Sequence, residues 1–467
     1  MESMKRGFAA MLVIVALLAA FGTGYRVRAS NESGWMPPTS ARAIALTDTP
    51  QGQRIADRSG QSMDIAPKRA YKPNLKPYET LDEVRKNIRE NFVRTNIDET
   101  ELTYGAVRGM LRSLGDRFTR FLTPEDYRRF TEQTDGEFIG IGARIDVIED
   151  YSGSPLAKPY GASRPYIVEA IDGGAAQKAD LKKDDVILTI DGKSTAEMSA
   201  DAVVTLIRGK ENTIVKLKIE RKLKAAAMNR DAVYKQFDKE LKREKIELHP
   251  VTLEWLPNRI AWLRLDEFNH RSGPEMTKAL NEIKVGPKGE DGKPQGAARG
   301  IVFDMRDNPG GLLNVAVDIG SRFVPSGPIV IERERNGSEH SLDAEKERFM
   351  NFKMPVVVLV NNYSASAAEI VTGALKDNGV ATIMGEQSYG KASVQVLLPL
   401  KNGGALVMTT AKYLTPAKRD ISDKGIEPDV VVKPSAEDEK TGRGAQLDKA
   451  VAFIQEKNST AVAARTP

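Results

Sequence analysis

The chain has 467 residues, of which 40% are hydrophobic and 28% charged, a composition typical of soluble globular protein with two or three domains. Its formal net charge of +5 is small for this length, so composition alone gives no case for nucleic-acid binding. Cysteine is absent and only 3 histidines occur, with no H-E-x-x-H pair. This excludes disulfides, cysteine zinc sites, thiol catalysis and a zincin metalloprotease.

Residues 1–29 have the features of an export segment. A basic pair precedes an apolar run from Phe8 to Phe21, which is near the length of a signal-peptide core and shorter than the roughly 18–20 residues of a confident membrane-spanning helix. Cleavage could follow Ala29, but Arg26 and Arg28 stand where cleavage sites are usually uncharged. We therefore expect a signal peptide or, preferably, an uncleaved anchor in the cytoplasmic membrane. The remaining chain is expected to be extracytoplasmic, in the periplasm or cell envelope.

Two segments precede the first change of pattern. Residues 30–76 are rich in Pro, Ser, Gly, Arg and Gln without an apolar period, which predicts a flexible linker. Residues 77–135 are expected to be helical, because apolar residues recur at helical spacing from Leu81 to Phe92. The Thr-Pro-Glu sequence at 123–125 indicates the start of a further helix.

The pattern then becomes β-rich. Residues 136–222 contain short strand-like runs and one expected helix near Ser199–Ile207, which indicates a small, mainly β domain. Residues 223–248 are highly charged, with apolar residues at i, i+4, i+8 from Val233 to Leu241. We interpret them as a solvated, charged helical insert in preference to a docking helix.

Residues 249–467 alternate apolar strands with helices, the pattern of an α/β domain. The whole chain is thus expected to be a multidomain α+β and α/β protein. The expected strands of the last domain include Ile260–Leu265, Ile301–Met305 and Val356–Val360, and its expected helices lie near 274–283, 312–323, 366–376 and 447–457.

One candidate site element is the sequence D-M-R-D-N-P-G-G from Asp304 to Gly311, directly after an apolar strand. A Pro-Gly-Gly turn at the carboxyl end of a strand exposes consecutive N–H groups, since glycine tolerates positive φ and close approach. Such groups can stabilise an oxyanion. Taken alone, however, the segment is better interpreted as an ordinary strand-to-helix turn.

A second element is the serine-rich stretch 364–369, again between an apolar strand and a helix. Ser366 would lie at the positive end of that helix. However, Ser366 and Glu369 also fit a capping box, in which the hydroxyl merely satisfies a backbone donor. Ser364 could cap the helix instead and leave Ser366 free.

The stretch from Gly385 to Ala392 nearly matches the phosphate-binding P-loop, G-x-x-x-x-G-K-[ST]. Ala392 replaces the hydroxyl that would hold Mg²⁺, and a strand is expected where a P-loop needs a helix, so nucleotide binding is excluded. The stretch instead supplies Lys391. A lysine can act as the base for a serine if burial keeps it neutral. None of the 3 histidines lies in a segment that favours it as this base, and the α/β-hydrolase motif G-x-S-x-G is absent.

Together these motifs make the chain resemble the carboxyl-terminal processing peptidases, or tail-specific proteases, from about Tyr78 to Lys457. The family motif D-L-R-x-N-P-G-G corresponds to 304–311, with Met305 in place of leucine. The motifs S-A-S-A-x-E-I and G-K-x-x-V-Q correspond to 364–370 and 390–395. As a set, the motifs are far more specific than any one of them.

The resemblance implies a two-lobed β/α serine-peptidase core with a PDZ domain inserted before the active-site strands. In that core Ser366 would be the nucleophile, Lys391 the base, and Gln395 the residue that orients the lysine. The oxyanion hole is implied to comprise N–H groups of Ala367 and of Gly310 or Gly311.

Residues 136–222 resemble a PDZ domain, whose glycine loop receives a peptide's terminal carboxylate while the next strand pairs with the tail. Two family signatures are altered, since Asp180 stands in place of the glycine of A-G-L and Asp184 in place of that of G-D. Because aspartate adopts left-handed conformations, though less readily than glycine, we expect the domain fold to persist. The implied tail-binding residues are Gly140, Ile141, Gly142, Ala143 and Ile145.

The combined motifs predict a serine endopeptidase of the C-terminal processing type, which hydrolyses exported proteins bound by their C-terminal tails. The alternative is a non-catalytic PDZ scaffold or regulator that retains the peptidase fold, but a scaffold has no need of a lysine beside a serine. The expected partners are protein or peptide substrates, and the membrane through the N-terminal segment, with no nucleic acid and no cofactor or metal. A homo-oligomer or an adaptor stays open.

Overall fold

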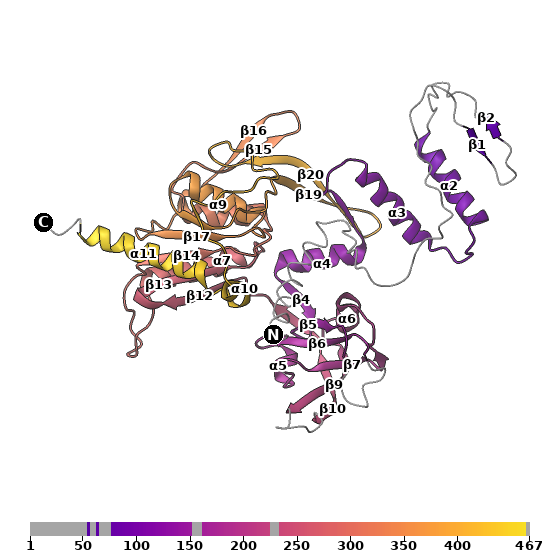
Figure 1. Cartoon of the computed structure of the whole chain (residues 1–467), viewed down its shortest axis with the longest axis horizontal. Helices are drawn as coiled ribbons and strands as arrows, with labels where there is room; N and C mark the ends of the chain where they lie inside the picture. Colours follow the sequence, from indigo (N-terminus) through magenta and orange to yellow (C-terminus); the bar gives the residue numbers. More distant parts are fainter. Residues whose placement is uncertain (1–53, 57–61, 65–75, 152–160, 225–232, 464–467) are drawn as a thin grey trace. The chain divides into compact units, whose positions relative to one another are not determined.

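The computed structural model describes residues 54–56, 62–64, 76–151, 161–224 and 233–463 (Figure 1). The chain divides into two compact units, with a boundary between Gly109 and Met110. The predicted export segment, residues 1–29, lies outside the described residues. None of the helices in the described ranges is long and apolar enough to cross a membrane.

The unit that ends at Gly109 contains short elements with little burial. Within the predicted linker, β1 (Arg54–Ala56) and β2 (Ser62–Asp64) pair antiparallel. The helix α2 (Pro77–Asn91) has no buried residue, and α3 (Glu99–Arg112) continues across the boundary. The helical pattern of this region is therefore confirmed.

The segment that leads into the β domain contains one strand that the sequence pattern did not indicate. The strand β3 (Arg120–Leu122) precedes α4 (Pro124–Asp135). As predicted, α4 begins at the Thr-Pro-Glu signal, because the Thr123 hydroxyl accepts a hydrogen bond from the Asp126 N–H at 3.2 Å. Phe121 and Leu122 are buried, so β3 is fixed by packing as well as by pairing.

The small β domain is one antiparallel sheet in the order β10-β9-β7-β6-β5, so that β5 forms an edge. Buried apolar side chains of the strands and of α6 form its core. The elements are β5 (Ala143–Ile148), β6 (Arg164–Ala170), α5 (Ala175–Lys178), β7 (Val186–Ile190), β8 (Lys193–Ser194), α6 (Ala200–Ile207), β9 (Ile214–Lys224) and β10 (Val233–Lys242).

In two turns of this domain, aspartate was expected to adopt the left-handed conformation in place of glycine. Asp180 and Asp184 adopt φ values of 59° and 68°, the left-handed region that favours glycine. Asp180 also faces a cation, since one of its carboxylate oxygens lies 3.5 Å from Nη1 of Arg221. The expected persistence of the fold is confirmed.

The prediction of a helical insert at 223–248 is wrong. Here β10 pairs with β9, and β11 (Glu244–Glu247) pairs with β4 (Glu137–Gly140). The spacing i, i+4, i+8 did not distinguish the two structures, because positions four apart share one face of a strand as well as of a helix. Cross-strand ion pairs such as Lys216–Glu240, at 2.7 Å, account for many of the charges. Residues 225–232 lie outside the described part of the chain.

The last domain confirms the predicted α/β alternation. Its main sheet has the order β12-β13-β14-β17-β18-β21, in which only β12 runs antiparallel to its neighbour. The strands are β12 (Val251–Leu256), β13 (Ile260–Leu265), β14 (Gly300–Asp304), β17 (Val356–Val360), β18 (Thr382–Gly385) and β21 (Val430–Val431).

Helices cover both faces of this sheet. One face packs against α7 (Ser272–Val285), α8 (Leu313–Ser321) and α9 (Ala367–Asp377), and the other against α11 (Ala445–Ala463). Alternate residues of one strand separate the two cores: Phe303 belongs to the first and Val302 to the second. The sequences of parallel strands that are buried on both faces are continuous apolar runs, which is why these strands could be predicted.

A second sheet completes the last domain. It joins β16 (Glu339–Asp343), β15 (Pro328–Glu334), β20 (Ala405–Leu414) and β19 (Ser393–Pro399), and β3 pairs with β20. The strand β19 begins two residues after Lys391, and β20 lies between it and β15. The segment before α4 is thereby built into the same sheet as the strand that follows Lys391.

Candidate active site

The first motif turns at the carboxyl end of β14. Asp304 and Arg306 are buried and form an ion pair at 2.6 Å, which keeps the pKa of Asp304 below its usual range despite burial. Arg306 also bonds the Asp438 carboxylate at 3.0 Å and the Gly442 carbonyl at 2.7 Å. The motif arginine therefore attaches the strand end to the segment that precedes α11.

Asn308 fixes the glycine turn to its neighbours. Its amide donates to the Leu265 carbonyl at 2.7 Å and accepts from the Gly310 N–H at 2.8 Å. Its backbone carbonyl accepts from the Ala365 N–H at 2.9 Å. Because Asn308 is fully buried, these bonds hold the turn against the loop that carries Ser366.

Both glycines of the turn are required by close approach. Gly310 and Gly311 have φ values of 100° and 141°. A Cβ atom on Gly310 would lie 2.7 Å from Cβ of Ser366, and one on Gly311 would lie 2.1 Å from the Phe268 carbonyl oxygen. The predicted Pro-Gly-Gly turn thus lies directly beside the predicted serine.

Ser366 is held in a strained backbone conformation at the start of α9. Its φ of 56° and ψ of −116° are uncommon for a residue with a side chain and cost on the order of 1–3 kcal/mol. The residue is half-buried, whereas Ser364 is fully buried. The Ser364 hydroxyl accepts from the Asn361 N–H at 2.9 Å and donates to the Met305 carbonyl at 2.8 Å. Ser364 therefore joins two loops, and it does not cap α9 as the sequence had suggested.

Glu369 connects the serine and lysine segments. Its fully buried carboxylate accepts from the N–H groups of Ser366 at 2.9 Å, Gly390 at 2.6 Å and Lys391 at 2.9 Å. The Ser388 hydroxyl donates to it at 2.6 Å. Burial raises the pKa of Glu369, while these four donors oppose the rise. The predicted capping box of Ser366 and Glu369 at the start of α9 is therefore confirmed, and the bonds from Ser388, Gly390 and Lys391 are further contacts that the sequence did not indicate.

Tyr413 of β20 makes a second connection. Its buried hydroxyl lies 3.1 Å from the Ser366 carbonyl oxygen and 2.5 Å from that of Lys391. Among the residues that the structure describes, no hydrogen bond joins Ser366 Oγ to Lys391 Nζ. Their backbones are nevertheless held together from two sides, by Glu369 and by Tyr413.

Lys391 is partly buried beside the ring of Phe118. Its ammonium lies 5.2 Å from the centroid of the Phe118 ring. Burial of the amino group, with the positive charge of Arg120 as the next cause, lowers the pKa of Lys391 from 10.5 to about 8. Gln395 reaches this environment as well, but its amide donates to the Phe118 carbonyl at 2.8 Å. Phe118 and Arg120 come from the segment before α4, and no local signal connected them with Lys391.

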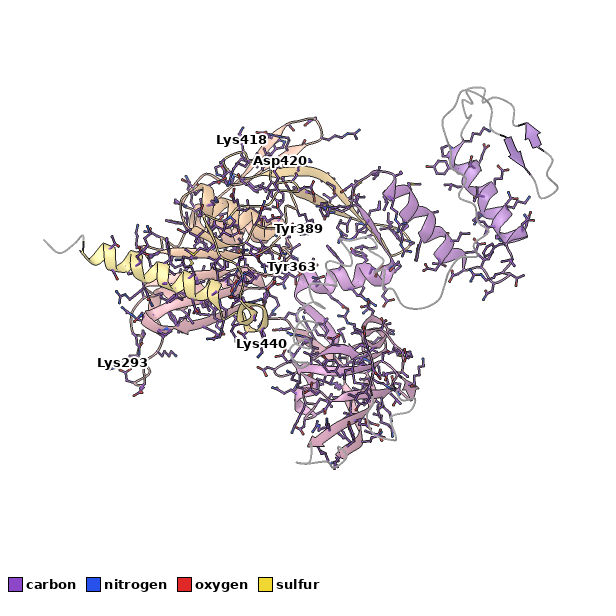
Figure 2. All side chains as sticks on the ribbon, in the orientation of Figure 1. Lys293, Tyr363, Tyr389, Lys418, Asp420 and Lys440 are labelled. Carbon is purple, nitrogen blue, oxygen red and sulfur yellow. The ribbon has the colours of Figure 1, made fainter. Side chains whose placement is uncertain are left out.

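Two exposed tyrosines flank the same loops, as labelled in Figure 2. Tyr363 precedes the serine loop, and the N–H of Tyr389 donates to the Ser364 carbonyl at 3.0 Å. The guanidinium of Arg117 lies 5.5 Å from the Tyr389 ring centroid. The surface beside Ser366 and Lys391 is therefore aromatic in part and accessible.

The predicted carboxylate-binding loop of the β domain lies between β4 and β5. Its Ile141 and Gly142 carbonyls accept from the N–H groups of Ala176 and Ile171, at 2.7 and 2.8 Å. Gly142 has a φ of 70° and lies against Gly174, so a side chain would not fit there. Gly140 ends β4, while Ala143 and the buried Ile145 lie on β5 at the sheet edge.

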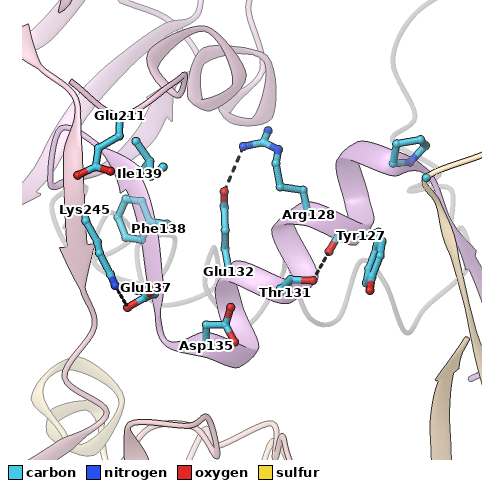
Figure 3. A pocket seen from close by; sticks show the side chains of 12 residues that line it. Tyr127, Arg128, Thr131, Glu132, Asp135, Glu137, Phe138, Ile139, Glu211 and Lys245 are labelled. Carbon is cyan, nitrogen blue, oxygen red and sulfur yellow. Dashed lines mark hydrogen bonds and ion pairs between the residues drawn. The ribbon is translucent and has the colours of Figure 1, made fainter. Parts of the chain in front are cut away.

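A cavity of about 600 Å³ lies between α4 and the pair of β4 and β11 (Figure 3). Half of the 12 residues that line it are charged, and several of these are paired, such as Lys245 with Glu137 at 2.6 Å. None of the predicted catalytic residues lines it. The cavity is therefore separate from the predicted Ser366 and Lys391 site.

Comparisons with known proteins match two families within the chain. The family Peptidase family S41 matches residues 259–432, and the family PDZ domain matches residues 166–221. The chain is 35% identical over 350 residues to a carboxyl-terminal-processing protease of Synechocystis sp., which covers 74% of each protein. It is 32% identical over 373 residues to the carboxy-terminal processing protease CtpA of Bacillus subtilis, covering 80% of this chain and 72% of that protein.

Among solved structures, the photosystem II D1 C-terminal processing protease shares 29% identity over 76% of this chain and 87% of its own, with a TM-score of 0.43. The two family matches fall on the domains described above, the small β domain and the domain with the Ser366 and Lys391 loops. The chain therefore belongs to the carboxyl-terminal-processing proteases of peptidase family S41 and contains a PDZ domain.

Proposed function

We propose that the protein is a serine endopeptidase in which Ser366 is the nucleophile and Lys391 the general base. The observation that carries this proposal is the Glu369 carboxylate, which binds the backbone N–H groups of both residues at 2.9 Å. The Ser364 hydroxyl donates to the Met305 carbonyl and accepts from the Asn361 N–H, so it is not a competing nucleophile. A pKa of about 8 leaves roughly a tenth of the Lys391 side chains neutral at pH 7.

The chemistry then proceeds through an ester. Neutral Lys391 accepts the proton of Ser366 Oγ as this oxygen forms a bond to the scissile carbonyl carbon. The tetrahedral intermediate collapses, the carbon–nitrogen bond breaks, and the lysine returns the proton to the leaving amine. Water then attacks the acyl carbonyl carbon while Lys391 accepts one of its protons. As the carbon–Oγ bond breaks, Lys391 returns this proton to Ser366 Oγ, and the product acid leaves.

Two N–H groups are proposed as the oxyanion hole. The Ala367 N–H is the first of α9, where helices leave donors without intrahelical partners. Gly310 donates its N–H to Asn308 at 2.8 Å, whereas within the described ranges the Gly311 N–H donates to no partner. We therefore assign Gly311 with Ala367 in preference to Gly310. Gln395 is proposed to orient Lys391 indirectly, through its hydrogen bond to Phe118.

Substrate tails are proposed to bind the PDZ domain along β5. Among the residues that the structure describes, this strand pairs with β6 alone, so its other side can pair with an extended peptide. The carbonyls of Ile141 and Gly142 are bonded inward, which supports a loop that presents N–H groups to a terminal carboxylate. Ile145 and Ala143 lie on this strand.

Cleavage assays with variants test the proposed dyad. Ser366→Ala and, separately, Lys391→Ala should each lower casein or peptide cleavage by on the order of 10⁴-fold or more, because both act as one unit. Ser364→Ala is the matched serine control and should retain far more activity. An inactive wild-type protein that still binds peptide tails would favour a non-catalytic scaffold, and an active Ser366→Ala protein would refute the nucleophile assignment.

A further inference from the structure

Arg120 lies close to the proposed base although it is far from it in the sequence. The strand β3, which starts at Arg120, pairs with β20, where Val407 is its partner. Nη1 of Arg120 lies 3.3 Å from the Phe118 carbonyl oxygen, and the Phe118 ring faces the Lys391 ammonium. The guanidinium and the ammonium are thus neighbours of the same Phe118 residue.

This guanidinium has no opposite charge to neutralise it. In the described part of the chain, no carboxylate lies within ion-pair distance of Arg120, and its buried Nε has no hydrogen-bond partner. A desolvated, unpaired cation costs several kcal/mol unless something compensates for it. Because arginine does not lose its proton in proteins, its charge acts on any neighbouring group that can titrate.

The groups that face Lys391 act in two directions. Burial and Arg120 disfavour the ammonium, whereas Glu369 of α9 and Asp116, before β3, favour it. The Asp116 carboxylate also accepts hydrogen bonds from the N–H groups of Phe118 and Thr119, at 3.0 and 3.1 Å. The fourth neighbouring element, β20, presents the neutral hydroxyl of Tyr413 to the Lys391 carbonyl at 2.5 Å. Arg120 is the one positive charge in this set.

We propose that Arg120 is a positioning residue whose fixed charge increases the neutral fraction of Lys391, so that the segment before the PDZ domain is part of the catalytic unit. The proposal rests on the proposed role of Lys391 as base. It differs from a purely structural role for Arg120, because it concerns the proton on Lys391 and not only the packing of β3. Lysine next to a second cation is a known way to obtain a neutral amine near neutral pH.

The test compares Arg120→Gln with Arg120→Lys and with Arg335→Gln, a matched charge control on an exposed turn. For each full-length protein, kcat/KM is measured from about pH 6 to pH 10. In Arg120→Gln the acid limb should move to higher pH, so that activity near pH 7 falls roughly threefold to tenfold and recovers above about pH 9.5. Arg120→Lys and Arg335→Gln should follow the wild-type profile.

A second measurement determines the protonation of Lys391 as a function of pH without an activity assay. In the Ser366→Ala background, competitive acetylation followed by peptide mass spectrometry gives the titration of Lys391 without any activity. Adding Arg120→Gln should move that titration to higher pH, whatever the outcome of the cleavage assays. The two measurements therefore separate failure of this inference from failure of the proposed dyad.

Three outcomes would overturn the inference. The first is an unchanged Lys391 titration in a folded Arg120→Gln protein. The second is a loss of activity that is uniform across pH, as expected if Arg120 only supports β3. The third is a rise in KM alone, as expected if Arg120 binds a substrate carboxylate.

Discussion

Burial disfavours the charged form of the Lys391 amine. The free energy of unfolding should therefore depend on pH in the range where this amine titrates. Its pKa is about 8 in the folded protein, against an ordinary value of 10.5. Between these values the unfolded chain binds more protons than the folded one, so stability rises with pH across that window. Below about pH 8 the folded protein bears the full cost of the buried charge.

Lys391→Met should therefore be more stable than the wild type at pH 7, by roughly 1–3 kcal/mol, because methionine has similar length and no charge. The difference should shrink as pH rises from about 8 and become small above about 10.5, where the wild-type amine is largely neutral in both states. Denaturant unfolding at several pH values measures it. A stability difference that does not change with pH would show that Lys391 is not perturbed.

The edge strand β5 and the loop before it are expected to bind the C-terminal tail of a peptide. A terminal carboxylate would bind N–H groups of the 140–143 loop through charge-assisted hydrogen bonds, which are about twice as strong as neutral ones. Peptides with free, apolar C-termini should therefore bind roughly tenfold better than amidated or acidic-ended versions. Fluorescence anisotropy with the Ser366→Ala protein measures this, and binding should weaken when the loop is altered. Equal affinity for free and amidated tails would leave the PDZ domain without this role.

Elements could be predicted where the sequence of the element itself determines its structure, and not where pairing with a distant segment does. The buried strands β13 and β17 were predicted to the residue, because a strand covered on both faces is one apolar run. The strand-like run Ile214–Ile219 lies in β9 as expected, whereas its hairpin partner β10 was missed, because spacing by four fits strand and helix alike. In the same way, Ser366 and Lys391 carry motifs, whereas Phe118 reaches Lys391 only through the pairing of β3 with β20.

At the scale of the whole molecule, the N-terminal apolar run from Phe8 to Phe21 motivates the proposal of an extracytoplasmic, membrane-attached enzyme. The full-length protein should fractionate with membranes, and protease added outside the cytoplasmic membrane should degrade its globular part. A version that lacks residues 1–76 is the control and should be found in the soluble fraction. Recovery of the full-length protein from the soluble cytoplasm would contradict the proposal.

The central claim, that Ser366 attacks the substrate, is tested most directly by trapping the covalent intermediate. Wild-type protein is mixed with a cleavable peptide, quenched in acid within the first turnover, digested and mapped by mass spectrometry. The predicted result is an acyl group on Ser366 that matches the amino-terminal product and is absent from the Ser366→Ala protein. An acyl group on Ser364, or undiminished cleavage by Ser366→Ala, would contradict the account.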